Sequence, residues 1–126
     1  MSTTETKISR AEPTALLSEP TSPIRITPAF FFLLLCLTEG SRHGHVLARE
    51  VEERSGGSVK LGPGSLYWSL GRLAEVGLIE EVAAPPDETD DRRRYYGLTP
   101  WGREILARET ATLERVVEYA RLRGIV

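Results

Sequence analysis

Apolar and polar positions alternate with a helical period over most of this chain, and one run is apolar on every side. That run extends from Ala29 to Leu37, and such a pattern is typical of a helix that is covered all round. Thr27-Pro28 supplies an N-cap followed by a first-turn proline, and Gly40 supplies a stop. A domain of this size covers only part of such a helix, so we expect a second subunit to cover the rest.

Two further helices are predicted before the middle of the chain. Residues 43–54 form a short amphipathic segment that ends at Ser55-Gly56-Gly57, and Val59 and Leu61 flank Lys60 as a brief extended piece. The third helix opens at Gly62-Pro63-Gly64-Ser65 and ends at Gly77. Its buried positions are Leu66, Leu70 and Leu73. Its other face is expected to show Ser65, Trp68, Ser69 and Arg72, with Tyr67 at the edge.

The second half of the chain predicts a hairpin and a long helix. Residues 78–83 and 94–98 are strand-like, and the polar tip between them contains Arg92, Arg93 and Arg94. Thr99-Pro100 repeats the cap-then-proline signal, and the helix that it begins is expected to run to about Arg123. This helix has an intermittent apolar stripe and an i, i+4 pair, Glu104 with Arg108.

The order helix, helix, short strand, helix, hairpin, helix is that of a winged helix-turn-helix, whose third helix enters the DNA major groove. The predicted fold class is mainly α with a small β-hairpin. We expect an unstructured arm over residues 1–26, because it carries nine Ser or Thr and three Pro with no apolar period. The winged helix-turn-helix domain is expected over 27–98, and a long C-terminal helix over 99–126. The dimer interface is predicted to use Phe30, Phe31, Leu34, Leu113, Val116, Val117 and Ala120.

Length and composition narrow the class of protein. The 126 residues leave room for one core, one Cys excludes a disulfide framework, and no apolar run approaches the roughly 20 residues that span a bilayer. We therefore expect a cytoplasmic protein without membrane contact. The net charge of -2 does not indicate a nucleic-acid binder. Any DNA binding must therefore depend on a local patch of basic and polar side chains.

That patch is predicted on the third helix and the hairpin tip. Hydroxyl, aromatic and guanidinium groups on the helix are able to reach base edges or phosphates, and three arginines match phosphate oxygens. The candidate DNA-binding residues are Lys60, Pro63, Gly64, Ser65, Tyr67, Trp68, Arg72, Arg92, Arg93 and Arg94. Alternatives stay open for three of these features. The arginines follow Asp90 and Asp91, so the tip is also consistent with a self-neutralised turn. Tyr67 and Trp68 are also interpretable as packing residues at the helix edge, with packing favoured over a base contact for Tyr67, and Arg72 as a surface charge.

Catalytic patterns are missing from the sequence. Residues 62–66 (GPGSL) do not form a G-x-S-x-G elbow, and no P-loop or dinucleotide fingerprint appears. His43 and His45 are two apart on the predicted helix and therefore point to different faces. We predict neither enzymatic activity nor a metal or cofactor.

Four blocks together closely resemble the PadR family of transcriptional regulators. They are residues 37–45 (LTEGSRHGH), 59–67 (VKLGPGSLY), 73–79 (LAEVGLI) and 91–99 (DRRRYYGLT). The single C-terminal helix is similar to the short subfamily. The resemblance implies a winged helix followed by a C-terminal dimerisation helix over 99–126, a homodimer on double-stranded DNA, and repression from an inverted-repeat operator. Some members bind flat aromatic molecules between subunits, which implies a small aromatic effector.

Three hypotheses follow from these patterns. The first is a dimeric, sequence-specific DNA-binding repressor. The second is a winged-helix module that docks a partner protein, motivated by 8 basic against 10 acidic residues between Arg42 and Arg94. The third is a sensor of aromatic ligands at the dimer interface, which is compatible with the first. The ligand-binding residues are unknown.

Overall fold

The computed structural model describes residues 22–126, and helix α1 (Pro28–Cys36) lies at its centre. The Thr27 hydroxyl oxygen accepts the Phe30 N–H at 3.2 Å, and a 3₁₀ turn, η1 (Leu37–Glu39), carries the chain on to Gly40. Residues 1–21 of the expected arm lie outside the described residues. Ile24 and Ile26, which belong to the same expected arm, are half-buried against the core.

Helices α2 (Gly44–Arg54) and α3 (Pro63–Glu75) pack with α1 to form the core. The largest fully buried side chains are contributed by these helices, by the link that follows α3 and by the first residue of the next strand. They are Leu33, Leu34, Leu47, Val51, Leu70, Leu73, Leu78 and Ile79. Leucines at helical spacing on the three helices thus pack together in one core. This packing fixes which face of α3 is exposed to solvent.

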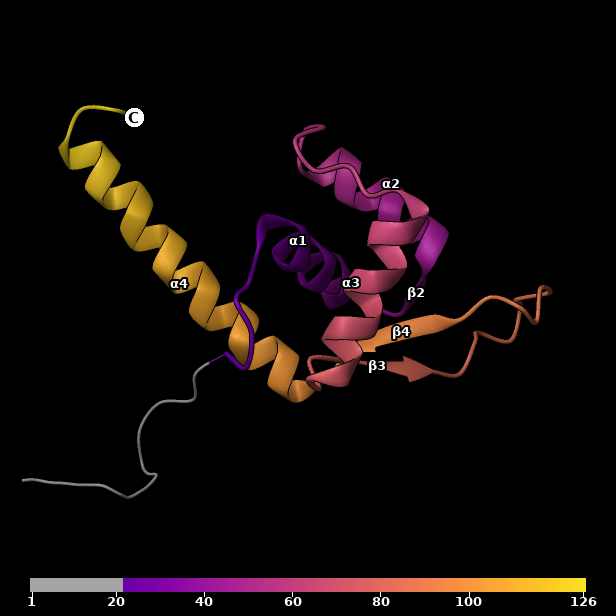
Figure 1. The fold of residues 1–126 in the computed structure, drawn as a ribbon. Coiled ribbons are helices and arrows are strands. Elements are labelled where there is room, and N and C mark those ends of the chain that lie inside the picture. The colour runs from indigo at the N-terminus through magenta and orange to yellow at the C-terminus, as the bar shows by residue number, and fades with distance from the viewer. Residues whose placement is uncertain (1–21) are drawn as a thin grey trace, which may run out of the picture.

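Three short antiparallel strands complete the domain in the order β2–β4–β3. Strand β3 (Ile79–Val82) pairs with β4 (Tyr95–Leu98), and β2 (Arg42–His43) covers the other edge of β4. These two strands and the loop between them (residues 79–98) form a wing, and the loop projects from the body (Figure 1). This arrangement of helices, sheet and wing is a winged helix-turn-helix.

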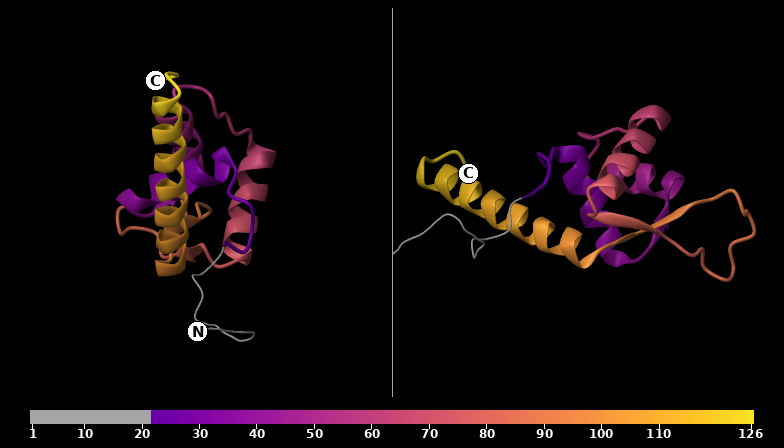
Figure 2. Two further views of the ribbon diagram at one scale, coloured as in Figure 1. Left: turned by 90° about the vertical axis from the view of Figure 1, so that its left-hand side faces the viewer. Right: turned by 60° about the horizontal axis from the view of Figure 1, so that its bottom comes forward.

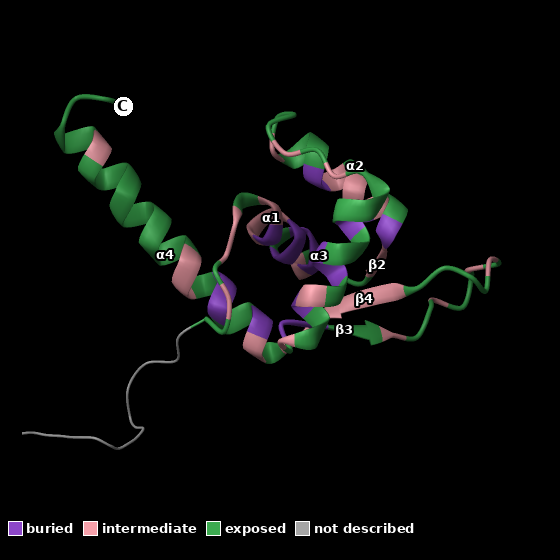
Figure 3. Ribbon diagram, in the orientation of Figure 1, coloured by how far each residue is buried: buried purple, intermediate pink, exposed green. Residues whose placement is uncertain are grey.

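Helix α4 (Pro100–Leu122) leaves the domain on the side away from the wing tip, as two views show (Figures 1 and 2). Its first turns are buried through Gly102, Ile105 and Leu106. Its second half is largely exposed (Figure 3). The predicted Glu104–Arg108 pair forms at 3.9 Å.

Two sequence expectations about local structure were wrong. The extended piece around Lys60 is not a strand, because the Ser55 hydroxyl accepts the Val59 N–H at 3.0 Å and ties this segment into a turn. The additional strand instead lies before α2, at the free edge of β4. Ser69 does not lie on the exposed face of α3: it is buried, because helical spacing places it between Leu66 and Leu73.

Candidate nucleic-acid interface

The solvent side of α3 is bordered by two aromatic side chains that point to different neighbours. Tyr67 faces the start of α2, where a Cβ added to Gly44 would come within 2.9 Å of the Tyr67 hydroxyl oxygen. Trp68 stacks on Phe30 of α1, with ring centroids 6.1 Å apart and an interplanar angle of 15°. Trp68 is nevertheless 65% exposed. The strip between the two rings carries Gly71, around which nothing lies within 4 Å of a built Cβ.

The start of α2, the Tyr67 edge of α3 and the wing enclose a groove of about 670 Å³. Its lining consists of His43, Gly44, His45, Tyr67, Gly71, Asp90, Arg92, Arg93, Arg94 and Tyr96. All three predicted wing arginines therefore line the same groove as the tyrosine of α3. The α2 N-terminus has no side-chain cap, so its backbone N–H groups add positive potential here.

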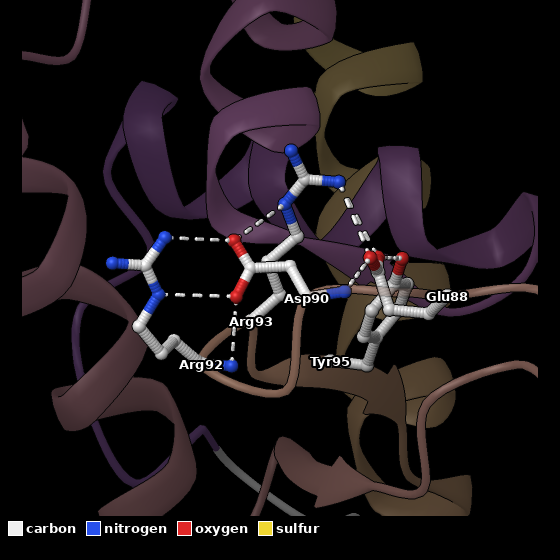
Figure 4. Close-up of polar contacts among 5 residues, drawn as sticks. All are labelled: Glu88, Asp90, Arg92, Arg93 and Tyr95. Atoms are coloured by element: carbon white, nitrogen blue, oxygen red, sulfur yellow. Dashed lines mark hydrogen bonds and ion pairs between the residues drawn. The ribbon is translucent and has the colours of Figure 1, made fainter.

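Carboxylates hold each wing arginine in place (Figure 4 for the tip). Arg92 donates from Nε and from a terminal nitrogen to the two Asp90 carboxylate oxygens, at 3.1 and 3.2 Å. Arg93 lies 3.4 Å from Glu88 and 3.9 Å from Asp90. Arg94 pairs across the hairpin with Glu81 at 2.9 Å. The self-neutralised turn that the sequence left open is thus present as ion pairs within the wing.

Glu88 organises the wing tip. Its side chain is only 6% exposed, it accepts hydrogen bonds from the Tyr95 hydroxyl and the Asp90 N–H, and Arg93 lies beside it. These contacts, led by the Tyr95 hydroxyl, lower the pKa of Glu88 to about 2 and raise the pKa of Tyr95. The hydrogen bonds from Arg92 lower the pKa of Asp90. Glu88 and Asp90 are therefore ionised at neutral pH.

The two histidines contribute to the groove without forming a metal site. Burial, with Arg93 nearby, lowers the pKa of His43, whose ring packs edge-on against Tyr95 with centroids 5.4 Å apart. The His43 and His45 ring centroids lie 6.5 Å apart. Residues 22–126 contain no cluster of three or more His, Cys, Asp or Glu arranged to hold a metal ion.

The other predicted DNA-binding residues are exposed or partly exposed at the start and along the side of α3. Pro63, Gly64 and Ser65 form its exposed first turn, and the Ser65 hydroxyl donates to the Gly62 carbonyl at 3.2 Å. Arg72 pairs with Glu75 at 2.9 Å. Lys60 is exposed in the link before α3 and does not line the groove.

The residues predicted for the dimer interface fall into two groups. Phe30 and Leu34 are buried within this chain's own core, so they offer little surface to a partner. Phe31 and Ala120 are partly exposed, and Leu113, Val116 and Val117 are exposed along the second half of α4.

Sequence reasoning missed Glu81, Glu88, Tyr95 and Tyr96 as parts of this region. The hairpin register places Glu81 opposite Tyr96, which brings Glu81 within reach of Arg94. Writing the two predicted strands side by side in antiparallel register shows that Glu81 and Arg94 are neighbours, so this pair could have been found from the sequence. The contact between Tyr67 and Gly44 depends on the packing of α2 on α3 and has no local signature.

Comparison with solved structures finds several transcriptional regulators of the same fold. A PadR family transcription regulator from Clostridium difficile is 24% identical, with a TM-score of 0.61 over 74% of this chain and 96% of that one. RosR of H. salinarum is 30% identical, with a TM-score of 0.57 over 79% of this chain and 88% of that one.

Within the described residues, no helix is both long and apolar enough to cross a membrane.

Comparison of sequences points the same way. An uncharacterized 37.1 kDa protein in transposon TN4556 of Streptomyces fradiae is 38% identical over 93 residues. That match covers 74% of this chain and 25% of the relative, so the chain spans about a quarter of that protein. The transcriptional regulator PadR-like family matches residues 33–108, which include the last turn of α1, all of α2 and α3, the wing and the first turns of α4. Regulators of this family act by binding DNA and are not enzymes. The chain belongs to the PadR-like family of transcriptional regulators.

Proposed function

We propose that this protein regulates transcription by inserting α3 into the major groove of a specific DNA site while its wing follows the adjacent phosphate backbone. The observation that carries this proposal is the groove shared by Tyr67 and the three wing arginines. A base-reading helix and a phosphate-binding hairpin must face one duplex together, and here their side chains line one surface.

Individual roles follow from exposure and chemistry. Ser65, Tyr67, Trp68 and Arg72 project polar or aromatic groups from α3 that are suited to base edges or phosphates. Gly64 and Gly71 leave the backbone of α3 uncovered, which favours close approach to the groove floor. Pro63 is the first residue of α3, and Lys60 lies in the link before it. Phosphate contacts at this end of a recognition helix position it on the duplex.

We propose that two copies associate through α4. The face of α4 that buries Gly102, Ile105 and Leu106 in its own domain continues, at helical spacing, as Leu113, Val116, Val117 and Ala120. That continuation is uncovered, with Val116 56% exposed. A second copy presents the same stripe, and the balanced charges from Thr99 onward, 5 basic against 4 acidic, do not oppose self-association.

The dimer proposal leads to an inverted-repeat operator. Two-fold symmetry sets the two α3 helices about one duplex turn apart, roughly 34 Å, so each reads one half-site. Occupancy of such an operator beside a promoter blocks transcription, and we propose repression as the outcome.

Release by a planar aromatic molecule at the dimer interface is the remaining part of the proposal. Tyr119 is 68% exposed on α4, beside the apolar stripe. Titration of the dimer with planar aromatic compounds, followed by the fluorescence of Trp68 on α3 and of Trp101 in the first turn of α4, tests this part. Saturable quenching supports it, and unchanged emission contradicts it.

Selection of bound duplexes from a random pool by the full chain tests the proposed function. We expect an inverted repeat with half-sites about 10 base pairs apart, and we expect the Tyr67→Ala variant to lose that preference. No enrichment, together with binding that does not depend on salt, would contradict the proposal. That result would favour the second candidate, a protein-docking module, for which the carboxylate paired with every wing arginine is the supporting observation.

A further inference from the structure

The wing carries more negative than positive charge, although it is the element expected to meet DNA. Between Ile79 and Leu98 there are three arginines and six carboxylates, which gives this segment a net charge of -3. The carboxylates are Glu80, Glu81, Asp87, Glu88, Asp90 and Asp91. A duplex is a polyanion, so unshielded carboxylates at this position oppose its approach.

Two of these carboxylates occupy the donor groups that a phosphate would use. Asp90 takes both Nε and a terminal nitrogen of Arg92, which is the two-point geometry by which arginine also holds a phosphate. Glu81 takes a terminal nitrogen of Arg94 at 2.9 Å. Arg92 and Arg94 have side-chain exposures of 87% and 68%, so both remain accessible to a competing anion.

The Asp90 carboxylate is fixed rather than loosely attached. The Asp90 N–H donates to Glu88 at 2.9 Å, and the Asp90 carboxylate also accepts the Arg92 N–H at 2.9 Å. Because Glu88 is itself nearly buried and held by Tyr95, the turn keeps Asp90 in place. A phosphate that engages Arg92 must therefore displace or share a carboxylate that stays nearby.

We propose that Asp90 and Glu81 are specificity-determining residues that withhold Arg92 and Arg94 from phosphate and so lower the affinity for DNA of any sequence. The inference rests on the proposed function, since it concerns how the same surface selects its site. Sequence-independent binding comes almost entirely from phosphate contacts. When those contacts are weakened, a duplex is retained only where α3 adds favourable contacts with the bases.

Charge-neutralising substitutions of equal size test this inference. Asp90→Asn and Glu81→Gln remove a carboxylate that is paired with an arginine. Asp91→Asn is the matched control, because Asp91 is exposed on the same turn and makes no ion pair among the described residues. The readout is the fluorescence anisotropy of a random-sequence duplex of about 30 base pairs, titrated with the full chain between about 50 and 200 mM salt.

We expect Asp90→Asn and Glu81→Gln each to bind the random duplex roughly three- to tenfold more tightly, with the logarithmic salt slope steeper by up to about 1. Asp91→Asn should give a smaller gain. In an Arg92→Ala background the gain from Asp90→Asn should shrink to that of Asp91→Asn, because the arginine that it releases is absent and only the general loss of one negative charge remains. Thermal unfolding of every variant checks the fold, and Glu81→Gln supplies an independent result if Asp90→Asn disturbs the tip.

The outcomes separate the inference from the proposed function. Salt-dependent binding by the wild-type chain, with Asp90→Asn and Glu81→Gln no tighter than Asp91→Asn, overturns the inference alone. A gain from Asp90→Asn that stays at its full size in the Arg92→Ala background also overturns it. Wild-type binding that does not respond to salt overturns the proposed function, and the inference with it.

Discussion

Gly102 lies against the main chain of Leu78 with no space for a side chain. A Cβ built on Gly102 would stand 2.0 Å from the Leu78 carbonyl oxygen and 2.9 Å from its carbonyl carbon. Leu78 belongs to the link between α3 and β3, and Gly102 is in the first turn of α4. The contact therefore fixes the start of α4 on the link that follows the candidate recognition helix.

This contact predicts that Gly102→Ala destabilises the protein. The added methyl group meets backbone atoms that cannot move aside, and overpacking of this kind costs about 1–3 kcal/mol or more. Gly71→Ala is the control within another helix. Its Cβ would meet nothing within 4 Å, so replacing a helical glycine should stabilise by up to about 1 kcal/mol. Chemical denaturation measures both, and equal effects at the two positions would refute the packing argument.

The two threonine caps should differ in their importance. Thr99 accepts the Gly102 N–H at 2.9 Å and also donates to the Gly77 carbonyl at 2.6 Å, whereas Thr27 makes one cap bond, at 3.2 Å. Thr99→Ala should cost about 1–2 kcal/mol of unfolding free energy, and Thr27→Ala about 0.5–1 kcal/mol. Comparison of denaturation midpoints checks the order, and a larger loss for Thr27→Ala would be inconsistent with these contacts.

Glu88 predicts an acid-sensitive wing. Its pKa falls from the ordinary value of 4.5 to about 2 on folding, so its contacts stabilise the folded chain above about pH 4.5. That contribution is lost as the pH falls from about 4.5 towards 2. The stability difference between wild type and Glu88→Gln should therefore shrink over this range. Tyr95→Phe removes the largest cause of the shift and should move the loss to higher pH. A pH-independent difference would contradict this account.

Much of the helical framework could be predicted, because its signals are local. Helices begin in the structure at the two predicted cap-and-proline pairs, Thr27-Pro28 and Thr99-Pro100, and α3 ends just before Gly77. Each of these signals acts within one or two helical turns. Strand β2 could not be predicted, since Arg42 and His43 become a strand only by pairing with distant residues of β4.

The residue types of the candidate site could be predicted from the sequence, but the contacts that these residues make within the fold could not. The wing arginines are evident in the sequence, yet a glutamate in a polar tip ordinarily indicates a solvated residue. Only the folded turn buries Glu88 beneath Tyr95 and Arg93. Likewise, an all-apolar α1 indicates burial without saying by what, and this chain itself covers Phe30 and Leu34.

The exposed apolar stripe on the second half of α4 predicts that two copies associate. A single charged side chain placed in this stripe should prevent the association. Val117→Asp places a carboxylate in the proposed interface and should convert the dimer to a monomer in sedimentation experiments. Arg115→Asp, which helical spacing places on another side of α4, should leave the dimer intact. A wild-type chain that sediments as a monomer at all concentrations would contradict the proposed dimer.

The salt dependence of duplex binding tests the central claim most directly, because each neutralised phosphate adds about 0.9 to the logarithmic slope. The binding affinity of the wild-type chain for duplex DNA should fall steeply as salt rises. Replacing Arg92, Arg93 and Arg94 together by alanine should flatten the slope for the selected operator duplex by up to about 3. For a random duplex the flattening should be smaller, because Asp90 and Glu81 withhold Arg92 and Arg94 there, and the melting temperature should stay close to that of the wild type. An identical slope for the two proteins would show that the wing does not bind the phosphate backbone.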